Sequence, residues 1–219
     1  MATVQANNVI DIYRKRAPKY NFTANLYYFI GFREYAYRKR AVKALHLHQG
    51  DTVVEIGCGT GLNFAFLQKA VGAEGKIIGV DLTDAMLAEA QKRVEQHGWS
   101  NVELINCDAA SFDFPKRVDG ILSTFALSLM PDIEKIISKG AEALTPGKRW
   151  VVLDLKEPSN WLRKLRPLFL PIVRPFAVTN QLIQERPWEI IRQSFQQHLK
   201  NTSMRELYGG FSFLITGEA

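Results

Sequence analysis

Apolar and polar positions between residues 51 and 157 alternate between two kinds of pattern. Short apolar runs that stop at glycine or at a polar residue predict strands, because the buried strands of a parallel sheet are nearly continuous apolar segments. The predicted strands are residues 51–56, 76–80, 102–106, 118–124 and 148–155. Stretches with apolar residues three or four positions apart predict the helices 62–71, 84–97 and 133–144. This alternation indicates an α/β fold with a mostly parallel sheet and helices on both faces.

The segment before this region has a different pattern. Residues 8–48 mix aromatic and basic residues at roughly helical spacing, with a break at Pro18. We expect residues 1–50 to form an N-terminal helical cap that controls substrate access, and residues 51–219 to form one domain. Within this domain, residues 158–184 are an insertion in which three prolines rule out a continuous helix.

The C-terminal region predicts a hairpin. Residues 204–207 and 211–216 are strand-like and are joined across Gly209 and Gly210. Two strand-like runs separated by a glycine turn favour antiparallel pairing. The sheet should therefore end in an antiparallel hairpin.

The charge of the chain is unevenly distributed. The 219 residues carry a formal net charge of +6. Residues 1–50 contain nine basic and two acidic residues, residues 158–184 contain four basic and no acidic residues, and the region between them is acidic. Basic segments favour an anionic partner, either a nucleic acid or a membrane surface. No apolar run is long enough to span a bilayer, and the N-terminus lacks the layout of a signal peptide, so we expect a cytoplasmic protein.

A glycine-rich loop is the strongest local signal. The sequence VVEIGCGTG at residues 53–61 follows a predicted strand and opens a predicted helix, and its glycines let a ligand approach the main chain. The glycine spacing differs from the dinucleotide pattern, and Glu55 suits a cationic ligand better than a phosphate. Asp81 and Asp108 end the next two strands, where carboxylates can accept hydrogen bonds from ribose hydroxyls and from an adenine amine. Together these residues predict a pocket for a nucleoside with a positive centre.

The segments VVEIGCGTG, GVDLTDAML, NCDA, VDGILSTFALSLMP and LTPGKRWVVLD resemble the ordered motifs of class I S-adenosylmethionine-dependent methyltransferases. The resemblance covers roughly residues 50–157. It implies a Rossmann-like, seven-stranded sheet and S-adenosylmethionine as the cofactor. By position, it implies that the cofactor is bound by Glu55, Gly57, Cys58, Gly59, Gly61, Asn63, Asp81, Leu82, Met86, Asp108, Ala109, Ser123 and Phe125.

The segment after the fourth strand narrows the choice of methyl acceptor. Residues 123–128 contain no carboxylate or histidine that could serve as a general base. They also lack the Asn/Asp-Pro-Pro-Tyr/Phe pattern of enzymes that methylate nucleobases, and the paired glutamates of arginine methyltransferases. We therefore expect a small molecule or a lipid headgroup as the acceptor, and no nucleic acid partner.

Tyr13 and Tyr20 lie in a segment that resembles the Tyr-x(4)-Pro-x-Tyr pattern of soluble bacterial phosphatidylethanolamine, betaine-lipid headgroup and quinone methyltransferases. This resemblance implies that both tyrosines close over the cofactor, with Tyr13 and Tyr20 as catalytic candidates and Tyr20 also as a cofactor ligand. Asn21 stands where these families usually have aspartate, which leaves a role for that carboxylate in doubt. The expected substrate-binding residues are Tyr28, Leu127, Ser128 and Arg174.

Three functions remain open at this point. The principal one is methylation of a lipid headgroup amine, of the phosphatidylethanolamine or betaine-lipid type. The alternative is carbon methylation of a quinone ring, or methylation of another small molecule. A third, of a different class, is a non-catalytic module on the same fold that binds a membrane or RNA.

Residues 158–184 interleave apolar and aromatic residues with four basic ones. That composition suits a segment lying at an anionic membrane surface, and it equally suits a substrate lid. We expect peripheral contact with the inner membrane leaflet.

Cys58 and Cys107 should stand at the ends of the first and third strands, too far apart for a disulfide. The four histidines show no metal-ligand spacing, so we expect no metal.

Overall fold

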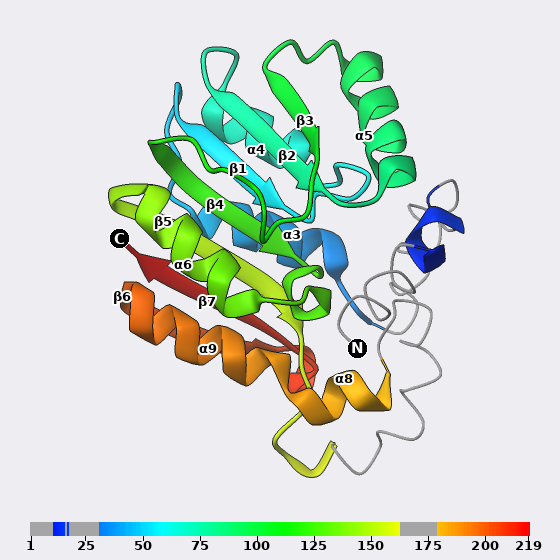
Figure 1. The fold of residues 1–219 in the computed structure, drawn as a ribbon, viewed down its shortest axis with the longest axis vertical. Coiled ribbons are helices and arrows are strands. Elements are labelled where there is room, and N and C mark those ends of the chain that lie inside the picture. Colours follow the sequence, from blue (N-terminus) through cyan, green and yellow to red (C-terminus); the bar gives the residue numbers. More distant parts are fainter. Residues whose placement is uncertain (1–10, 16, 18–30, 163–178) are drawn as a thin grey trace.

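The computed structural model describes residues 11–15, 17, 31–162 and 179–219 (Figure 1). The helices are α3 (Glu34–Ala44), α4 (Phe64–Val71), α5 (Asp84–His97), α6 (Ile133–Ala143), α8 (Asn180–Glu185) and α9 (Pro187–His198), with short 3-10 helices η3 (Leu127–Leu129) and η6 (Tyr208–Gly210). The strands are β1 (Thr52–Ile56), β2 (Lys76–Asp81), β3 (Val102–Asn106), β4 (Val118–Thr124), β5 (Leu144–Leu155), β6 (Lys200–Leu207) and β7 (Ser212–Glu218).

All of these strands form one seven-stranded sheet in the order β3-β2-β1-β4-β5-β7-β6. Strands β1 to β5 pair in parallel, and β7 is antiparallel to both β5 and β6. The predicted fold class is confirmed, including the antiparallel hairpin at the C-terminal end. The strand order reverses between β1 and β4, and open α/β sheets bind their ligands at such a reversal.

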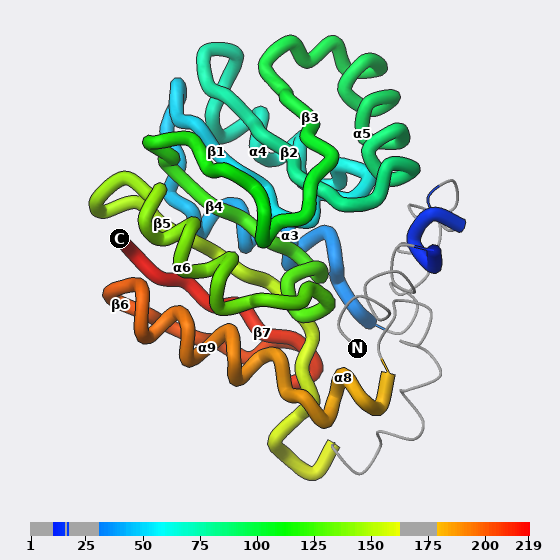
Figure 2. The backbone as a smooth tube through the Cα atoms, viewed as in Figure 1, coloured from blue at the N-terminus to red at the C-terminus, as the bar shows by residue number. Residues whose placement is uncertain are grey.

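Helices cover both faces of the sheet. One face carries α3, α4 and α5, and the other carries α6 and α9, as the path of the chain in Figure 2 makes clear. Buried side chains fill both interfaces, so the apolar runs that predict strands are explained by burial on two sides.

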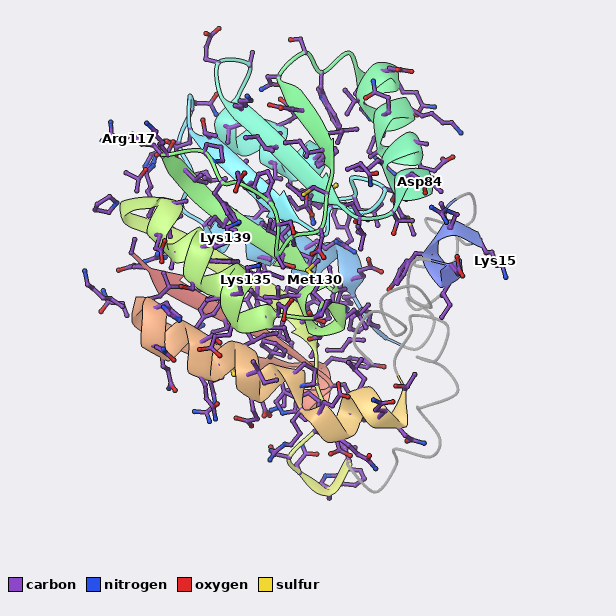
Figure 3. The ribbon with its side chains drawn as sticks, in the orientation of Figure 1. Lys15, Asp84, Arg117, Met130, Lys135 and Lys139 are labelled. Atoms are coloured by element: carbon purple, nitrogen blue, oxygen red, sulfur yellow. The ribbon has the colours of Figure 1, made fainter. Side chains whose placement is uncertain are left out.

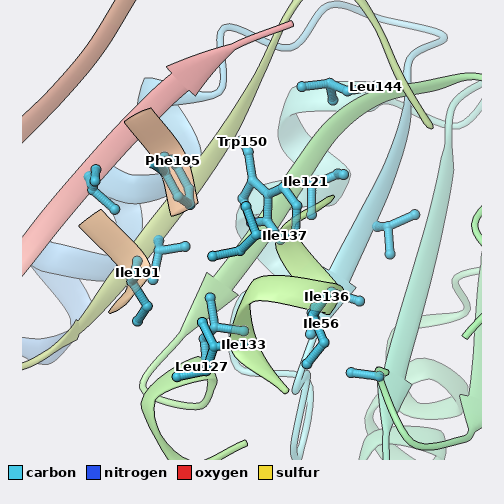
Figure 4. Packing of buried hydrophobic residues seen from close by; sticks show 14 of the residues in the cluster. Ile56, Ile121, Leu127, Ile133, Ile136, Ile137, Leu144, Trp150, Ile191 and Phe195 are labelled. Carbon is cyan, nitrogen blue, oxygen red and sulfur yellow. The ribbon is translucent and has the colours of Figure 1, made fainter. Parts of the chain in front are cut away.

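Trp150 is the largest side chain that is fully buried, and it organises the core under α6 and α9 (Figure 4). Its ring centroid lies 5.8 Å from that of Phe195 on α9. A Cβ at Gly140 on α6 would lie 2.4 Å from the Trp150 ring, so only glycine lets α6 approach the sheet at this point. This packing fixes the strand β5, whose far end is hydrogen-bonded to Phe125 and Ser128.

Several elements differ from the sequence prediction. Strands β5 and β6 each begin four residues earlier than predicted, and helix α9 was not expected at all. Pro187 stands at the first turn of α9, where its missing N–H is not needed. Trp188, Ile191 and Phe195, buried at helical spacing, are the signal that predicts this helix.

The N-terminal cap is only partly described. Helix α3 falls within the predicted cap and packs on the sheet through Ala41 and Val42. Tyr20, Tyr28 and Arg174 lie outside the described residues, as does most of the 158–184 insertion. In the described part of the chain, no helix is both long and apolar enough to cross a membrane.

Candidate functional site

A pocket lies at the carboxyl ends of the central strands, beside the reversal between β1 and β4. One side is lined by residues at the end of β2 and after β2 and β3, namely Val80, Asp81, Leu82, Thr83, Met86, Cys107, Asp108 and Ala109. The other side is lined by Arg38 on α3, by Gly57, Cys58, Gly59, Thr60 and Leu62 after β1, and by Thr124, Phe125, Ala126, Leu129, Met130 and Pro131 after β4. We call residues 125–131 the acceptor loop, because the predicted substrate-binding residues Leu127 and Ser128 belong to it.

Gly57 of the glycine loop lies against the acceptor loop. Its φ is +69°, and a Cβ built on it would lie 2.3 Å from the Ala126 Cβ and 2.9 Å from the Met130 Cε. Both the backbone conformation and the space therefore require glycine. The two loops that form the pocket are in direct contact here.

Asp81 connects the second strand to the glycine loop. Its Oδ2 accepts a hydrogen bond of 2.8 Å from the Gly59 N–H, and its Oδ1 accepts one of 2.8 Å from the Thr83 N–H. Burial raises the pKa of Asp81, while these N–H donors act in the opposite direction. The carboxylate lines the pocket, in the position expected of a ribose ligand.

The β2 and β3 side of the pocket has the chemistry of an adenosine site. Asp108 follows β3, and its Oδ1 accepts from the Ala110 N–H at 2.9 Å, which fixes the carboxylate in the pocket wall. Leu82 is 41% exposed and Met86 is buried, so the wall offers apolar surface for a base. Carboxylates for hydroxyl and amine groups, together with apolar surface, fit S-adenosylmethionine.

The N-terminal helical turn, residues 11–15, lies over this side of the pocket. Tyr13 lines the pocket and packs, with Ala17, beside Met86. Arg14 forms an exposed ion pair of 2.9 Å with Asp84, which stands at the start of α5 opposite the turn that carries Lys15 (Figure 3). Tyr13 therefore lies at the pocket, and its closing over the cofactor remains a prediction.

A buried polar network lies beneath the β1 and β4 side. Asn63 donates from Nδ2 to Glu55 Oε1 and to Thr124 Oγ1, and Arg38 donates from Nη1 to the same Thr124 oxygen. Arg38 also forms an ion pair of 2.7 Å with Glu34. Burial raises the pKa of Glu55 to about 7, partly offset by the Asn63 hydrogen bond and the positive charge of Arg38. The network joins the glycine loop to α3.

Arg38 reaches the pocket from this network. Its side chain is buried, and its guanidinium carbon lies 5.1 Å from the centroid of the Phe125 ring. Phe125 has a left-handed backbone, with φ of +55°, and its N–H donates to the Leu153 carbonyl at 2.7 Å. Behind it, Phe32 packs edge-on against Phe125, with ring centroids 5.7 Å apart. This end of the pocket is aromatic and apolar, with one buried cation.

The pocket brings together most of the predicted cofactor residues. Its lining includes Gly57, Cys58, Gly59, Asp81, Leu82, Met86, Asp108, Ala109 and Phe125. Tyr13, a predicted catalytic residue, also lines it. Their contacts with the cofactor remain predictions. Cys58 and Cys107 are free thiols, and β2 separates their strands, as expected.

Other predicted residues lie behind the lining. Glu55, Asn63 and Ser123 are fully buried and belong to the supporting structure, while Gly61 lies under the Phe64 ring. Leu127 and Ser128 are also buried, because η3 turns them toward the sheet, and Leu129 and Met130 line the pocket instead. Arg38 also lines the pocket but was not predicted from the sequence. It lies on α3, outside the glycine-loop region, and no local motif distinguishes it from the other basic residues of that helix.

Comparisons with known proteins place this chain beside methyltransferases. Residues 53–147 match the family model of the methyltransferase domain. A demethylmenaquinone methyltransferase from Listeria welshimeri is 23% identical, and the alignment covers 98% of this chain and 92% of that protein. A second demethylmenaquinone methyltransferase, from Geobacillus stearothermophilus, is 25% identical over 84% of this chain and 80% of its own length.

Solved structures share the fold. A SAM-dependent methyltransferase from Aquifex aeolicus superposes with a TM-score of 0.61 at 19% identity, covering 82% of this chain and 88% of that one. Geranyl diphosphate C-methyltransferase from Streptomyces coelicolor gives a TM-score of 0.65 at 16% identity, and the superposition covers 84% of this chain and 79% of that one. Phosphoethanolamine N-methyltransferase 2 from Haemonchus contortus gives 0.61 at 21% identity, covering 80% of this chain and 39% of that one.

Fold, pocket and family match define the class of protein. The chain is an S-adenosylmethionine-dependent methyltransferase with the class I fold. The expected enzyme class and cofactor are thereby confirmed. Among the described residues, no group of histidine, cysteine, aspartate or glutamate side chains could hold a metal ion.

Proposed function

We propose that this enzyme transfers the methyl group to a ring carbon of a quinol, a reaction of the kind named for its demethylmenaquinone methyltransferase relatives. This was the alternative to lipid headgroup methylation in the sequence analysis. The observation that carries the choice is the buried cation Arg38 beside the Phe125 ring at the acceptor end.

The charge of this end favours an acceptor that becomes anionic. A ring carbon of a quinol becomes nucleophilic when the neighbouring oxygen loses its proton, and a nearby cation stabilises the resulting oxyanion. An amine acceptor would become a cationic product, which the same guanidinium would disfavour. Glu34 forms an ion pair with Arg38 and balances its charge. Arg38 belongs to the described pocket lining and Glu34 does not, so an acceptor in the pocket would lie next to the guanidinium.

The chain's contribution to such a transfer is alignment and exclusion of water. S-adenosylmethionine supplies an electrophilic methyl carbon when it is bound. Phe125, Leu129 and Met130 would hold a planar ring against that carbon, and Arg38 would hold the ring oxygen. These residues would keep the ring carbon in line with the methyl group that the cofactor gives up, and the ring proton that the methyl group replaces would leave to solvent.

A labelling experiment tests this proposal. The enzyme would be incubated with methyl-labelled S-adenosylmethionine and, in parallel, with demethylmenaquinone reduced before the assay or with phosphatidylethanolamine vesicles. We expect label in the quinone product. Label in the phospholipid alone would overturn the proposal, and so would the absence of label from both products while a third acceptor in a total lipid extract is methylated.

Lipid headgroup methylation is the second candidate. The observation in its favour is the fold likeness to phosphoethanolamine N-methyltransferase 2, together with the basic segments of the sequence. The phospholipid arm of the same experiment decides it.

We also infer that the enzyme meets its acceptor at an anionic membrane surface. The side chain of Trp161 is 70% exposed. The preceding residue, Asn160, donates a hydrogen bond of 3.1 Å from Nδ2 to the carbonyl of Gly209, which follows Tyr208 in the chain. Tyr208 packs on Phe32, whose ring contacts Phe125 in the pocket. Sedimentation with anionic and with neutral vesicles tests the inference. Equal binding to both, or binding to neither, would overturn it.

A further inference from the structure

The acceptor loop, residues 125–131, is held in a strained conformation. Phe125 at its start and Asp132 just after its end both have a φ of +55°, a left-handed conformation that residues other than glycine adopt at a cost. Such conformations persist only where the surrounding structure enforces them. The loop must therefore be fixed by bonds from outside itself.

Two of these bonds come from the end of β5. The Phe125 N–H donates to the Leu153 carbonyl at 2.7 Å, and the Ser128 N–H donates to Asp154 Oδ2 at 2.9 Å. The other Asp154 oxygen, Oδ1, accepts from the Leu155 N–H at 2.8 Å. Both oxygens of this carboxylate are thus engaged by main-chain donors, one of them in the acceptor loop.

Among the residues that the structure describes, no cation acts on the Asp154 carboxyl. It is only 3% exposed, and the groups acting on it are burial and hydrogen-bond donors, with no charged side chain among them in the described structure. The neighbouring η3 and β7 present the neutral residues Ser128 and Ser212, and Lys156, two residues farther along the chain, is ion-paired with Glu206. Burying an unpaired carboxylate costs stability, so this residue is not explained by the stability of the core.

We propose that Asp154 is a positioning residue of this methyltransferase, whose ionised carboxylate holds the Ser128 N–H and thereby keeps the acceptor loop in the conformation that lines the pocket. The carboxylate does not itself line the pocket, so it acts on the acceptor through Phe125, Leu129 and Met130. The expected changes in acceptor KM rest on the proposed function.

The ionisation state of Asp154 links the loop to pH. Burial raises the pKa of Asp154 to about 6. Below that value the carboxyl carries a proton, and one of its two oxygens no longer accepts freely from a main-chain N–H. The acceptor loop is therefore fixed above about pH 6 and loosened below it.

Asp154→Asn tests the proposal, because asparagine is a permanently neutral side chain of the same shape. Asp119→Asn is the matched control. The Asp119 carboxylate also accepts from a main-chain N–H, that of Thr52 at 3.0 Å, but at the starting ends of β1 and β4. Each variant would be compared with wild type by hydrogen exchange of peptides covering 125–131 and 57–61, by calorimetric binding of S-adenosylhomocysteine, and by kinetics with reduced demethylmenaquinone.

We expect Asp154→Asn to speed exchange in 125–131 by on the order of tenfold, with little change in 57–61. The KM for the acceptor should rise by on the order of tenfold, while the affinity for S-adenosylhomocysteine changes by less than about threefold. The wild-type KM should rise as the pH falls through about 6, and the KM of Asp154→Asn should not follow. Asp119→Asn should behave as wild type.

Two results would overturn the proposal. One is unchanged exchange in 125–131 in Asp154→Asn. The other is an equal loss of S-adenosylhomocysteine affinity and acceptor affinity, which would indicate general damage to the fold. Hydrogen exchange needs no acceptor, so it decides the role of Asp154 even if reduced demethylmenaquinone proves not to be the substrate.

Discussion

Arg38 gives the acceptor end of the pocket its charge. It comes from α3, far in sequence from the glycine loop, and it reaches the site through Thr124 and the Phe125 ring. Its neighbour Glu34, one helical turn earlier, holds the guanidinium from the side away from the pocket. A cation built in this way can orient an oxyanion without a general base.

Replacing Arg38 with methionine should lower kcat/KM for the ring acceptor by on the order of ten- to a hundredfold, because the developing oxyanion loses its cation. Binding of S-adenosylhomocysteine should change little. Arg149→Met is the matched control, since Arg149 makes an ion pair of the same geometry with Glu218 at the other end of the sheet. Steady-state kinetics and calorimetry check both, and equal losses in the two variants would contradict the role of Arg38.

Glu55 predicts a pH dependence of stability. Its pKa in the folded protein is about 7, above the value of 4.5 for an exposed glutamate, so the ionised form is disfavoured by folding. Wild type should therefore lose stability as the pH rises from about 4.5 to about 7. Glu55→Gln does not titrate and keeps an oxygen for the Asn63 amide.

The free energy of unfolding of Glu55→Gln, relative to wild type, should increase by about 2 kcal/mol between about pH 5 and pH 8. Urea unfolding of the cofactor-free proteins at several pH values measures this difference. A difference that does not vary with pH would mean that Glu55 titrates normally in the folded state.

At the scale of elements, the glycine loop and the acceptor loop form one unit through Gly57. Gly57→Ala would force its Cβ against Ala126 and Met130. We expect the cofactor-free protein to lose about 2 kcal/mol or more of stability. Gly59→Ala is the control, because its φ is also positive but its Cβ would meet nothing within 4 Å. Thermal unfolding should show a smaller loss for Gly59→Ala, of about 1 kcal/mol, and equal losses would contradict the steric argument.

The sequence predicts the elements and the cofactor side of the pocket better than the acceptor side. Strands such as residues 118–124 and the motif around Gly57 are local patterns, so they are visible without the fold. Arg38, Met130 and Asp154 act across elements that only the folded sheet brings together. Leu127 and Ser128 were expected at the substrate because they follow a strand end, but the turn of η3 buries them.

At the scale of the whole molecule, the described N-terminal turn lies outside the two core clusters on the faces of the sheet. Tyr13 and Ala17 contact the rest of the described chain near Met86, and Arg14 adds one exposed ion pair. An exposed pair of this kind contributes little to stability. The two core clusters lie on the faces of the sheet and contain neither Tyr13 nor Ala17.

Deleting residues 1–20 should therefore leave the melting temperature within a few degrees of wild type, because these contacts contribute little to stability. Turnover should be lost, since Tyr13 no longer covers the pocket. Thermal unfolding and the labelling assay measure the two effects. Asp84→Asn, which removes only the ion pair with Arg14, should keep turnover, and full activity of the truncated chain would remove Tyr13 from the site.

The contact between Gly57 and Ala126 has a consequence for enzyme engineering. Because of this contact, some positions in the pocket wall require small side chains, while others can accept larger or different ones. Libraries that seek a new acceptor should leave Gly57 and Ala126 unchanged and vary Leu129 and Met130, which line the pocket from the same loop. Variants chosen in this way would change the shape of the pocket while the glycine loop keeps its geometry.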